Sequence, residues 1–372
     1  MHFYIHQEPN WPNFIWNNDS LMPFLGNIRY LQGRLIGKME SLGFDLQNEA
    51  NLEILTLDVL KTSEIEGEIF NPEQVRSSLA KRLGIEISGL VASDRYIDGV
   101  VDMLLDATQH FMNPLTQERL FDWHAAMFPT GRSGMYKIVV GGWRDDATGP
   151  MQVVSGALGR ENVHYQAPDA INIDNEMTQF LDWFNKQTAI DPILKAGIAH
   201  LWFVTIHPFE DGNGRIARAL TDMLLARADG LPQRFYSMSS QIRVERKGYY
   251  DILEKTQKGD LDITAWLSWF LYCLESALSS SEETLRKVIT KHQFWVKNAS
   301  IIQNERQKLM LNKLLDSFEG KLTSSKWAKI TKSSTDTALR DIQDLVNKNI
   351  LQKTDESGRS TNYVLVYSIL QQ

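Results

Sequence analysis

The residues with the clearest chemical potential lie in positions 207–218, whose sequence is HPFEDGNGRIAR. Gly212 and Gly214 flank Asn213 and lack a Cβ, so the backbone N–H groups of this loop can converge without obstruction. Because a helical pattern follows directly, those N–H groups lie at a helix N-terminus, which attracts anions. The stretch therefore predicts an anion-binding loop.

Four side chains beside this loop add reactive groups. Arg215 and Arg218 are three residues apart and share one face of the following helix. Asp211 supplies a hard oxygen ligand suited to Mg²⁺, and His207 can accept or release a proton near neutral pH. A glycine-rich turn with solvated arginines is the structural alternative. So many suitable groups in one short stretch favour phosphate chemistry.

Two apolar runs must position the loop. Upstream, residues 193–206 have the spacing of a buried helix, with Asp191 placed to cap it and Pro192 at its first position. Downstream, a second helical pattern begins at Arg215 and closes at Gly230. The sequence thus predicts a helix, a tight polar loop and a second helix.

This stretch resembles the signature of the Fic (Fido) family, H-P-F-x-D/E-G-N-G/K-R-x-x-R, and fills every specified position. The resemblance implies a mainly α fold, in which a helical bundle carries a small β-hairpin flap. It also implies a protein adenylyltransferase that moves AMP from ATP to a Ser, Thr or Tyr hydroxyl, with Mg²⁺ bound. Removal of AMP, or a transcriptional regulator that uses the core as a nucleotide sensor, stays open as an alternative.

The resemblance also implies a role for each residue of the signature. His207 would be the catalytic base and Asp211 the Mg²⁺ ligand. The ATP site would be formed by the following seven residues, Gly212, Asn213, Gly214, Arg215, Ile216, Ala217 and Arg218. In the family a tyrosine pair lies beside the adenine, which points to Tyr249 and Tyr250; for Tyr249 a core position is an equal alternative.

A second, weaker pattern lies at the end of a predicted helix over residues 48–65. Thr62, Glu66 and Gly67 match the Fic inhibitory motif S/T-x-x-x-E-G/N, and Gly67 suits a helix C-terminus. Alone, the segment is better explained as a solvated acidic patch. Together with the signature, it implies class II autoinhibition, in which Glu66 pairs with Arg218 and takes the place of a γ-phosphate.

Between residues 129 and 168 glycines cluster and β-favouring residues appear. We expect a hairpin of residues 153–155 and 163–166. The resemblance implies that it is the flap that docks an extended target segment by strand addition. Its docking residues would be Val154, Val163, His164 and Tyr165. A purely structural hairpin is the alternative.

The remaining patterns divide the chain into three predicted domains. An N-terminal helical module (1–89) contains a helix over 21–39 and a helix start at Pro72, the Fic core spans 90–295, and a C-terminal module spans 300–372. The last module has helices at 304–318, 325–330 and 335–347, then strands at 350–352 and 363–366 around a polar tip at 355–360. This order is typical of a winged helix-turn-helix.

The second helix of that turn motif carries Asp336, Asp341 and Asp344, which we expect to repel phosphates. DNA binding and protein docking or dimerisation both stay open for this module. The target protein is unknown, and self-modification and a homodimer are further expectations.

Composition sets the remaining limits. The 372 residues carry a net charge of −7 and 43% hydrophobic residues, as expected for a soluble globular protein without broad nucleic-acid affinity. Cys273 is the one cysteine and falls in an apolar helical pattern, so no intrachain disulfide forms and a cytoplasmic location is expected. We find no secretory signal and no transmembrane stretch.

Overall fold

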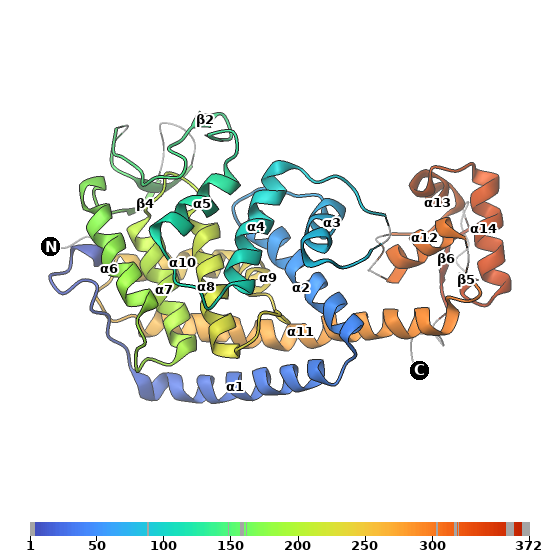
Figure 1. The fold of residues 1–372 in the computed structure, drawn as a ribbon, viewed down its shortest axis with the longest axis horizontal. Coiled ribbons are helices and arrows are strands. Elements are labelled where there is room, and N and C mark those ends of the chain that lie inside the picture. Colours follow the sequence, from blue (N-terminus) through green and yellow to red (C-terminus); the bar gives the residue numbers. More distant parts are fainter. Residues whose placement is uncertain are drawn as a thin grey trace. The chain divides into compact units, whose positions relative to one another are not determined.

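The computed structural model describes residues 4–87, 89–147, 149–156, 160, 162–302, 304–315, 318, 320–354 and 361–366. The chain divides into two compact units, Met1–Glu282 and Glu283–Gln372. Helices dominate both units, and the strands form small antiparallel hairpins (Figure 1). The mainly α fold with a small hairpin is confirmed.

The N-terminal helices are α1 (Asn18–Glu40), α2 (Phe44–Ile65), α3 (Pro72–Leu83) and α4 (Arg95–Gln109). Helices α1 and α2 begin three and four residues before their predicted starts, and α2 has no side-chain cap. Helix α3 begins at Pro72 as predicted, where Asn71 Oδ1 accepts the backbone N–H groups of Glu73 and Gln74. Helix α2 packs against α3, α8 and α9, so the N-terminal helices and the predicted core share one unit.

The centre of this unit is the pair α7 (Pro192–Ile206) and α8 (Asn213–Asp229). Asp191 Oδ1 caps α7 by accepting the N–H of Ile193 at 2.8 Å, as predicted. Every residue of α7 after Pro192 is buried, as expected for a helix that is apolar on all sides. Helix α8 begins two residues before the predicted Arg215 and ends at Gly230, whose φ is +70°.

The other helices of the unit surround this pair: α5 (Gln117–Met127), α6 (Ile173–Asn185), α9 (Met238–Val244), α10 (Arg246–Gln257) and α11 (Thr264–Asn298), with short 3₁₀ turns at Ile5–Gln7 and Ala170–Asn172. Figure 1 shows α7 and α8 side by side within this group. Cys273 is buried in α11, as predicted. In the described part of the chain, no helix combines the length and the apolar character that crossing a membrane requires.

Two hairpins lie in the glycine-rich region. The predicted one pairs β3 (Gln152–Ser155) with β4 (Asn162–Gln166), and its register places Val154 opposite Val163. A second and smaller hairpin, β1 (Arg132–Ser133) with β2 (Tyr136–Lys137), was not expected from the sequence because its strands are too short to show a period.

The C-terminal unit contains α12 (Glu305–Leu315), α13 (Ser324–Thr331), α14 (Thr335–Asn347), β5 (Leu351–Lys353) and β6 (Tyr363–Leu365). The elements occur in the predicted order, and its core gathers around the buried Trp327. The predicted tip at 355–360 lies outside the described residues, so the winged helix-turn-helix stays a prediction.

One expectation for this unit was wrong for one of its three residues. Asp341 is buried and accepts hydrogen bonds from Arg306 Nε at 2.8 Å and from Asn304 Nδ2 at 2.7 Å. Asp344 accepts from Gln307 Nε2 at 2.8 Å. Asp341 is thus withdrawn from solvent, whereas Asp336 is exposed and the Asp344 side chain is 46% exposed.

Candidate active site

Helix α7 ends at His207, which has the left-handed φ of +54°. Its Nδ1 lies 3.2 Å from Val204 O, and because a carbonyl only accepts, Nδ1 carries the proton and Nε2 has a free lone pair. Burial lowers the pKa of His207 to about 4, and nearby Arg144 also lowers it. The imidazole is therefore neutral at pH 7 and able to accept a proton.

Arg144 fixes the backbone that carries His207. Its Nε donates to His207 O at 2.8 Å, and its backbone N–H donates to Pro208 O at 2.9 Å. Its other two nitrogens bind Pro168 O at 2.5 Å and Asp146 Oδ1 at 2.7 Å. Sequence reasoning missed this residue, because an isolated arginine in a glycine-rich segment matches no motif.

The loop after His207 is braced by Phe209 and Asn213. Asn213 Oδ1 accepts the N–H of Phe209 at 3.0 Å, and its Nδ2 donates to Phe209 O at 2.7 Å. Gly212 makes the turn with a φ of +83°, which disfavours other residues. The Asn213 side chain thus shapes the loop from behind, and Asn213 itself begins α8.

His124 of α5 supports the same loop. Its ring stacks on Phe209, with centroids 4.3 Å apart and planes at 9°. Its Nδ1 accepts the N–H of Gly141 at 3.2 Å, so Nε2 carries the proton and donates to Asp211 O at 3.2 Å. Burial lowers the pKa of His124 to about 4, which keeps this tautomer neutral. Sequence reasoning missed His124, because its role depends on tertiary contacts.

Asp211 presents its carboxylate beside this loop. Oδ1 accepts the N–H of Gly212 at 2.6 Å, and the other oxygen accepts the hydroxyl of Ser133. Among the described residues no cluster of three His, Cys, Asp or Glu side chains could hold a metal alone. One hard carboxylate fits Mg²⁺, which completes its shell with substrate phosphates and water.

The two arginines of α8 are nearly inaccessible to solvent: 3% of the Arg215 side chain and 2% of the Arg218 side chain are exposed. Arg218 Nη2 donates to Glu66 Oε1 at 2.7 Å, and its Nε donates to Thr62 Oγ1 at 2.7 Å. Burial alone would lower the pKa of Arg218, but Glu66 keeps it above its ordinary value. The structure thus brings together the residues of the predicted inhibitory contact.

Gly214 provides the space for this contact. A Cβ at position 214 would lie 2.3 Å from Glu66 Oε1 and 3.2 Å from Arg218 Nη1. Glu66 is the C-cap of α2, and Gly67 follows with a φ of +90°. The Glu66 carboxylate therefore lies directly over the start of α8.

Arg215 has its own acidic partner, because Nη1 donates to Glu68 Oε2 at 2.8 Å. Its guanidinium also lies 5.1 Å above the ring of Phe128. Arg215 Nε and Arg218 Nη1 are buried and have no hydrogen-bond partner among the described residues. Unpaired buried donors are costly, so these two N–H groups are suited to a further anion.

Residues 114–225 match the sequence profile of the Fic/DOC family, and residues 4–85 match DUF4172, a domain of unknown function. The chain contains a Fic/DOC domain.

Curated relatives agree with this assignment. The chain is 27% identical over 225 residues to "Protein adenylyltransferase Fic" of Drosophila willistoni, covering 58% of this chain and 39% of that protein. It is 38% identical over 88 residues to "Protein adenylyltransferase fic-1" of Caenorhabditis briggsae, covering 23% and 16%. The chain thus spans less than half the length of these relatives.

A solved structure shows the same fold. A Fic domain containing signaling protein from Bacteroides thetaiotaomicron aligns with a TM-score of 0.52 at 22% identity, over 70% of this chain and 97% of that one.

Of four further predicted ATP-site residues, three are buried and one is exposed. Ile216 and Ala217 are completely buried, and the Ile216 N–H is used within α8 on Gly212 O. Tyr249 is also buried, and its hydroxyl donates to His200 Nε2 at 2.8 Å, so its ring has no face available to a base. Tyr250 is more exposed, and its hydroxyl points toward Ile65 O at 3.5 Å, near the inhibitory segment.

The hairpin of the Fic domain also differs in part from expectation. Val154 is exposed and Val163 partly buried, as a docking edge requires. His164 is held by Glu254 Oε2 of α10 at 2.7 Å and by Ser155 Oγ at 2.6 Å. Tyr165 is buried and donates to Thr205 O at 2.7 Å, so it anchors the hairpin to α7 and offers no surface to a target.

Helices α2 and α8 each contribute a buried acid. Asp58 of α2 accepts the hydroxyl of Ser237, and its second oxygen has no hydrogen-bond partner among the described residues. Asp222 of α8 accepts from Arg234 Nη2 at 3.2 Å. Burial, together with the Asp222 charge, raises the pKa of Asp58 to about 8.

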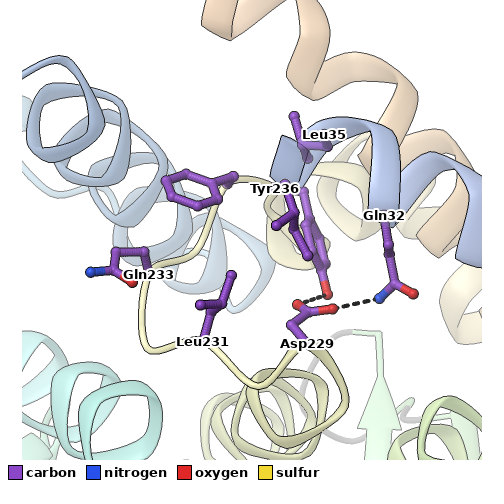
Figure 2. Close-up of a pocket in the computed structure, with 8 residues that line it drawn as sticks. Gln32, Leu35, Asp229, Leu231, Gln233 and Tyr236 are labelled. Carbon is purple, nitrogen blue, oxygen red and sulfur yellow. Dashed lines mark hydrogen bonds between the residues drawn. The ribbon is translucent and has the colours of Figure 1, made fainter. Parts of the chain in front are cut away.

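A small cavity at the end of α8 has a structural role. Its volume of about 10 Å³ suits roughly one water molecule. Figure 2 shows Asp229 accepting hydrogen bonds from Gln32 Nε2 of α1, at 2.7 Å, and from the Tyr236 hydroxyl, at 2.8 Å. Gln32, Asp229 and Tyr236 are already paired there, and the volume is too small for a larger ligand.

Proposed function

We propose that this protein transfers AMP from ATP to a Ser, Thr or Tyr hydroxyl of a target protein, and that Glu66 inhibits the transfer. One observation carries the proposal: an unprotonated His207 Nε2 and two buried arginines occur at the same loop. Among the described residues, each of these arginines has an N–H group without a hydrogen-bond partner. The names of the curated relatives support the same activity.

In the proposed reaction, His207 Nε2 takes the proton from the target hydroxyl as its oxygen attacks the α-phosphorus. A bond forms between that oxygen and phosphorus, and the bond from phosphorus to the bridging oxygen of pyrophosphate breaks. Arg144 and Val204 hold the imidazole and its backbone, so the base is oriented before the substrate arrives. The backbone N–H groups at the start of α8 and the Arg215 and Arg218 side chains bind the phosphate oxygens.

Asp211 would hold Mg²⁺, which neutralises charge on the phosphates when bound. The His124 contact to Asp211 O and the Gly212 contact to its carboxylate fix this residue in place. A metal-bound Asp211 would have to exchange its contact with the Ser133 hydroxyl for the cation.

In this proposal the β3–β4 hairpin docks the target protein. Gln152, Val154 and Ser155 are exposed on β3, so an extended target segment can add to this edge. Glu66 is the inhibitor, because it occupies Arg218 and places a negative charge where the γ-phosphate would bind.

Transfer of label from two forms of ATP tests the proposal. Glu66→Gly protein incubated with lysate and Mg²⁺, without DNA, should attach label from the α-phosphate to protein and none from the γ-phosphate. The Glu66→Gly, His207→Ala double variant should attach neither. Transfer of the γ-label would indicate a kinase, and ATP turnover that requires DNA would indicate a nucleotide-sensing regulator.

A further inference from the structure

The inhibitory segment carries two acidic side chains toward α8, and the Fic inhibitory motif specifies one. Helix α2 ends in a turn in which Glu68 N–H donates to Ser63 O at 3.0 Å and Gly67 N–H donates to Glu64 O at 3.2 Å. Because Gly67 reverses the backbone with a φ of +90°, Glu66 and Glu68 both reach the start of α8. Glu66 meets Arg218, and Glu68 meets Arg215.

The two contacts differ in their exposure to solvent. The Glu66 side chain is 31% exposed and its partner Arg218 has further bonds to Thr62. The Glu68 side chain is 46% exposed, and it is the one carboxylate that Arg215 contacts among the described residues. Arg215 also has a buried Nε without a hydrogen-bond partner there. The charge of the Arg215 guanidinium is therefore less well neutralised than that of Arg218. Its acidic partner Glu68 is also more easily displaced than Glu66.

We propose that Glu68 is a specificity-determining residue that competes with the β-phosphate of the nucleotide for Arg215. The proposal rests on the proposed function of this site. In this proposal the two acids have different effects. Glu66 prevents alignment of the triphosphate for attack, and Glu68 lowers the affinity for any nucleotide that carries a β-phosphate. Nucleoside monophosphates do not reach Arg215, so Glu68 leaves their affinity unchanged.

The size of the effect follows from the exposure of the pair. Because the Glu68 side chain is 46% exposed, water and salt weaken its pair with Arg215, so removing Glu68 should tighten nucleotide binding by about two- to fivefold. The gain should be largest at low ionic strength, since screening reduces the competition between the two anions. Thermal unfolding without nucleotide should begin at a lower temperature, because Arg215 then loses its partner.

Calorimetric titration of the full-length protein tests this. Glu68→Gln should lower the Kd for ADP by about two- to fivefold at about 50 mM salt and leave the Kd for AMP unchanged. At about 0.5 M salt the ADP Kd values of the variant and the wild type should be equal. Glu64→Gln is the matched control: it removes the same charge from the same segment, but Glu64 pairs with Lys61 and Arg243 and makes no contact with Arg215. Its ADP affinity should equal that of the wild type.

Equal ADP affinities in the wild type and Glu68→Gln would overturn the inference, as would an equal gain for AMP or for Glu64→Gln. The proposed function would survive any of these results if Glu66→Gly still transfers AMP. Absence of nucleotide binding in every variant would instead overturn both.

Discussion

Glu66 Oε1 lies 2.7 Å from Arg218 Nη2, and this contact joins the end of α2 to the phosphate-facing helix α8. The guanidinium is buried, so its charge needs a partner whether or not nucleotide is present. In the proposed function, the Glu66 carboxylate and a nucleotide phosphate are alternative partners for this charge. Under the proposed function, activity would depend on the position of α2.

Glu66→Gly should raise the rate of AMP transfer strongly, by about 10²-fold or more, since a misplaced α-phosphorus costs a rate factor of this order. ATP affinity should change much less than the rate. Single-turnover rates with labelled ATP, measured beside calorimetric Kd values, separate the two effects. Equal rates for Glu66→Gly and wild type would mean that Glu66 is only a helix-terminal acid.

His207→Ala in the Glu66→Gly background should lower the rate by about 10²–10⁴-fold with little change in ATP affinity. Because burial lowers the pKa of His207 to about 4, the imidazole is deprotonated above about pH 5. The acid limb of kcat/KM should then lie near pH 4, well below the 6.5 of a free histidine. Circular dichroism at each pH would confirm that the fold persists, and an acid limb at 6.5 would contradict the burial argument.

Arg144→Lys should slow AMP transfer by about 10²-fold, because the lysine ammonium cannot reproduce the contacts to His207 O, Pro168 O and Asp146 together. The ATP Kd should stay near the wild-type value, because Arg144 contacts the His207 backbone and none of the phosphate-binding groups. Thermal melting shows whether the variant is folded. A folded Arg144→Lys protein with an unchanged rate would show that the contact to His207 O does not position the base.

Asp58→Asn should stabilise the protein more at pH 8 than at pH 5. The pKa of Asp58 is about 8 when folded, against a model-compound value of 3.8, so between these values the folded state keeps a proton that the unfolded chain has released. Stability from this group therefore falls as pH rises, and the asparagine has no such dependence. Urea unfolding at both pH values measures the difference, with the exposed Asp45→Asn as the control. An equal difference at both pH values would exclude ionisation of Asp58 as its cause.

The full-length chain should bind random duplex DNA weakly, with a Kd above about 10⁻⁵ M at physiological salt. The exposed surface of α14 offers Arg340 beside Asp336, and its other acids are used within the unit. Fluorescence anisotropy across a salt series provides the measurement. Tight binding with a steep salt dependence, lost in Arg340→Ala, would assign a DNA-binding role to the C-terminal unit.

The parts of the site that could be predicted are those whose geometry is local. Residues 207–218 place a histidine, a carboxylate and two arginines around one turn, so their order along the chain determines their arrangement. The long-range pair of Glu66 and Arg218 was accessible only through the family resemblance. Nothing in the spacing of two residues so far apart in the chain indicates a contact.

The supporting residues could not be predicted, because their roles arise from tertiary packing. Arg144 and His124 hold the loop through backbone atoms, which leave no trace in residue patterns. The sequence patterns around Tyr165 and Tyr249 fit a surface position and a core position equally well. In the structure the hydroxyl group of each donates to a buried acceptor. Glu68 has an ordinary position in an acidic patch, and only the turn at Gly67 gives it a partner.

The absence of a side chain at Gly214 also limits how this protein could evolve constant activity. Any larger residue there would displace the Glu66 carboxylate, but it would also intrude on the loop where phosphates are expected. Loss of Arg218 would release the inhibitor and remove an anion ligand together. Under the proposed function, mutations in α8 would therefore weaken catalysis as they relieve inhibition, whereas a change in α2 would relieve inhibition alone. Natural variants with unrestrained activity should carry their changes in the inhibitory segment and keep the signature intact.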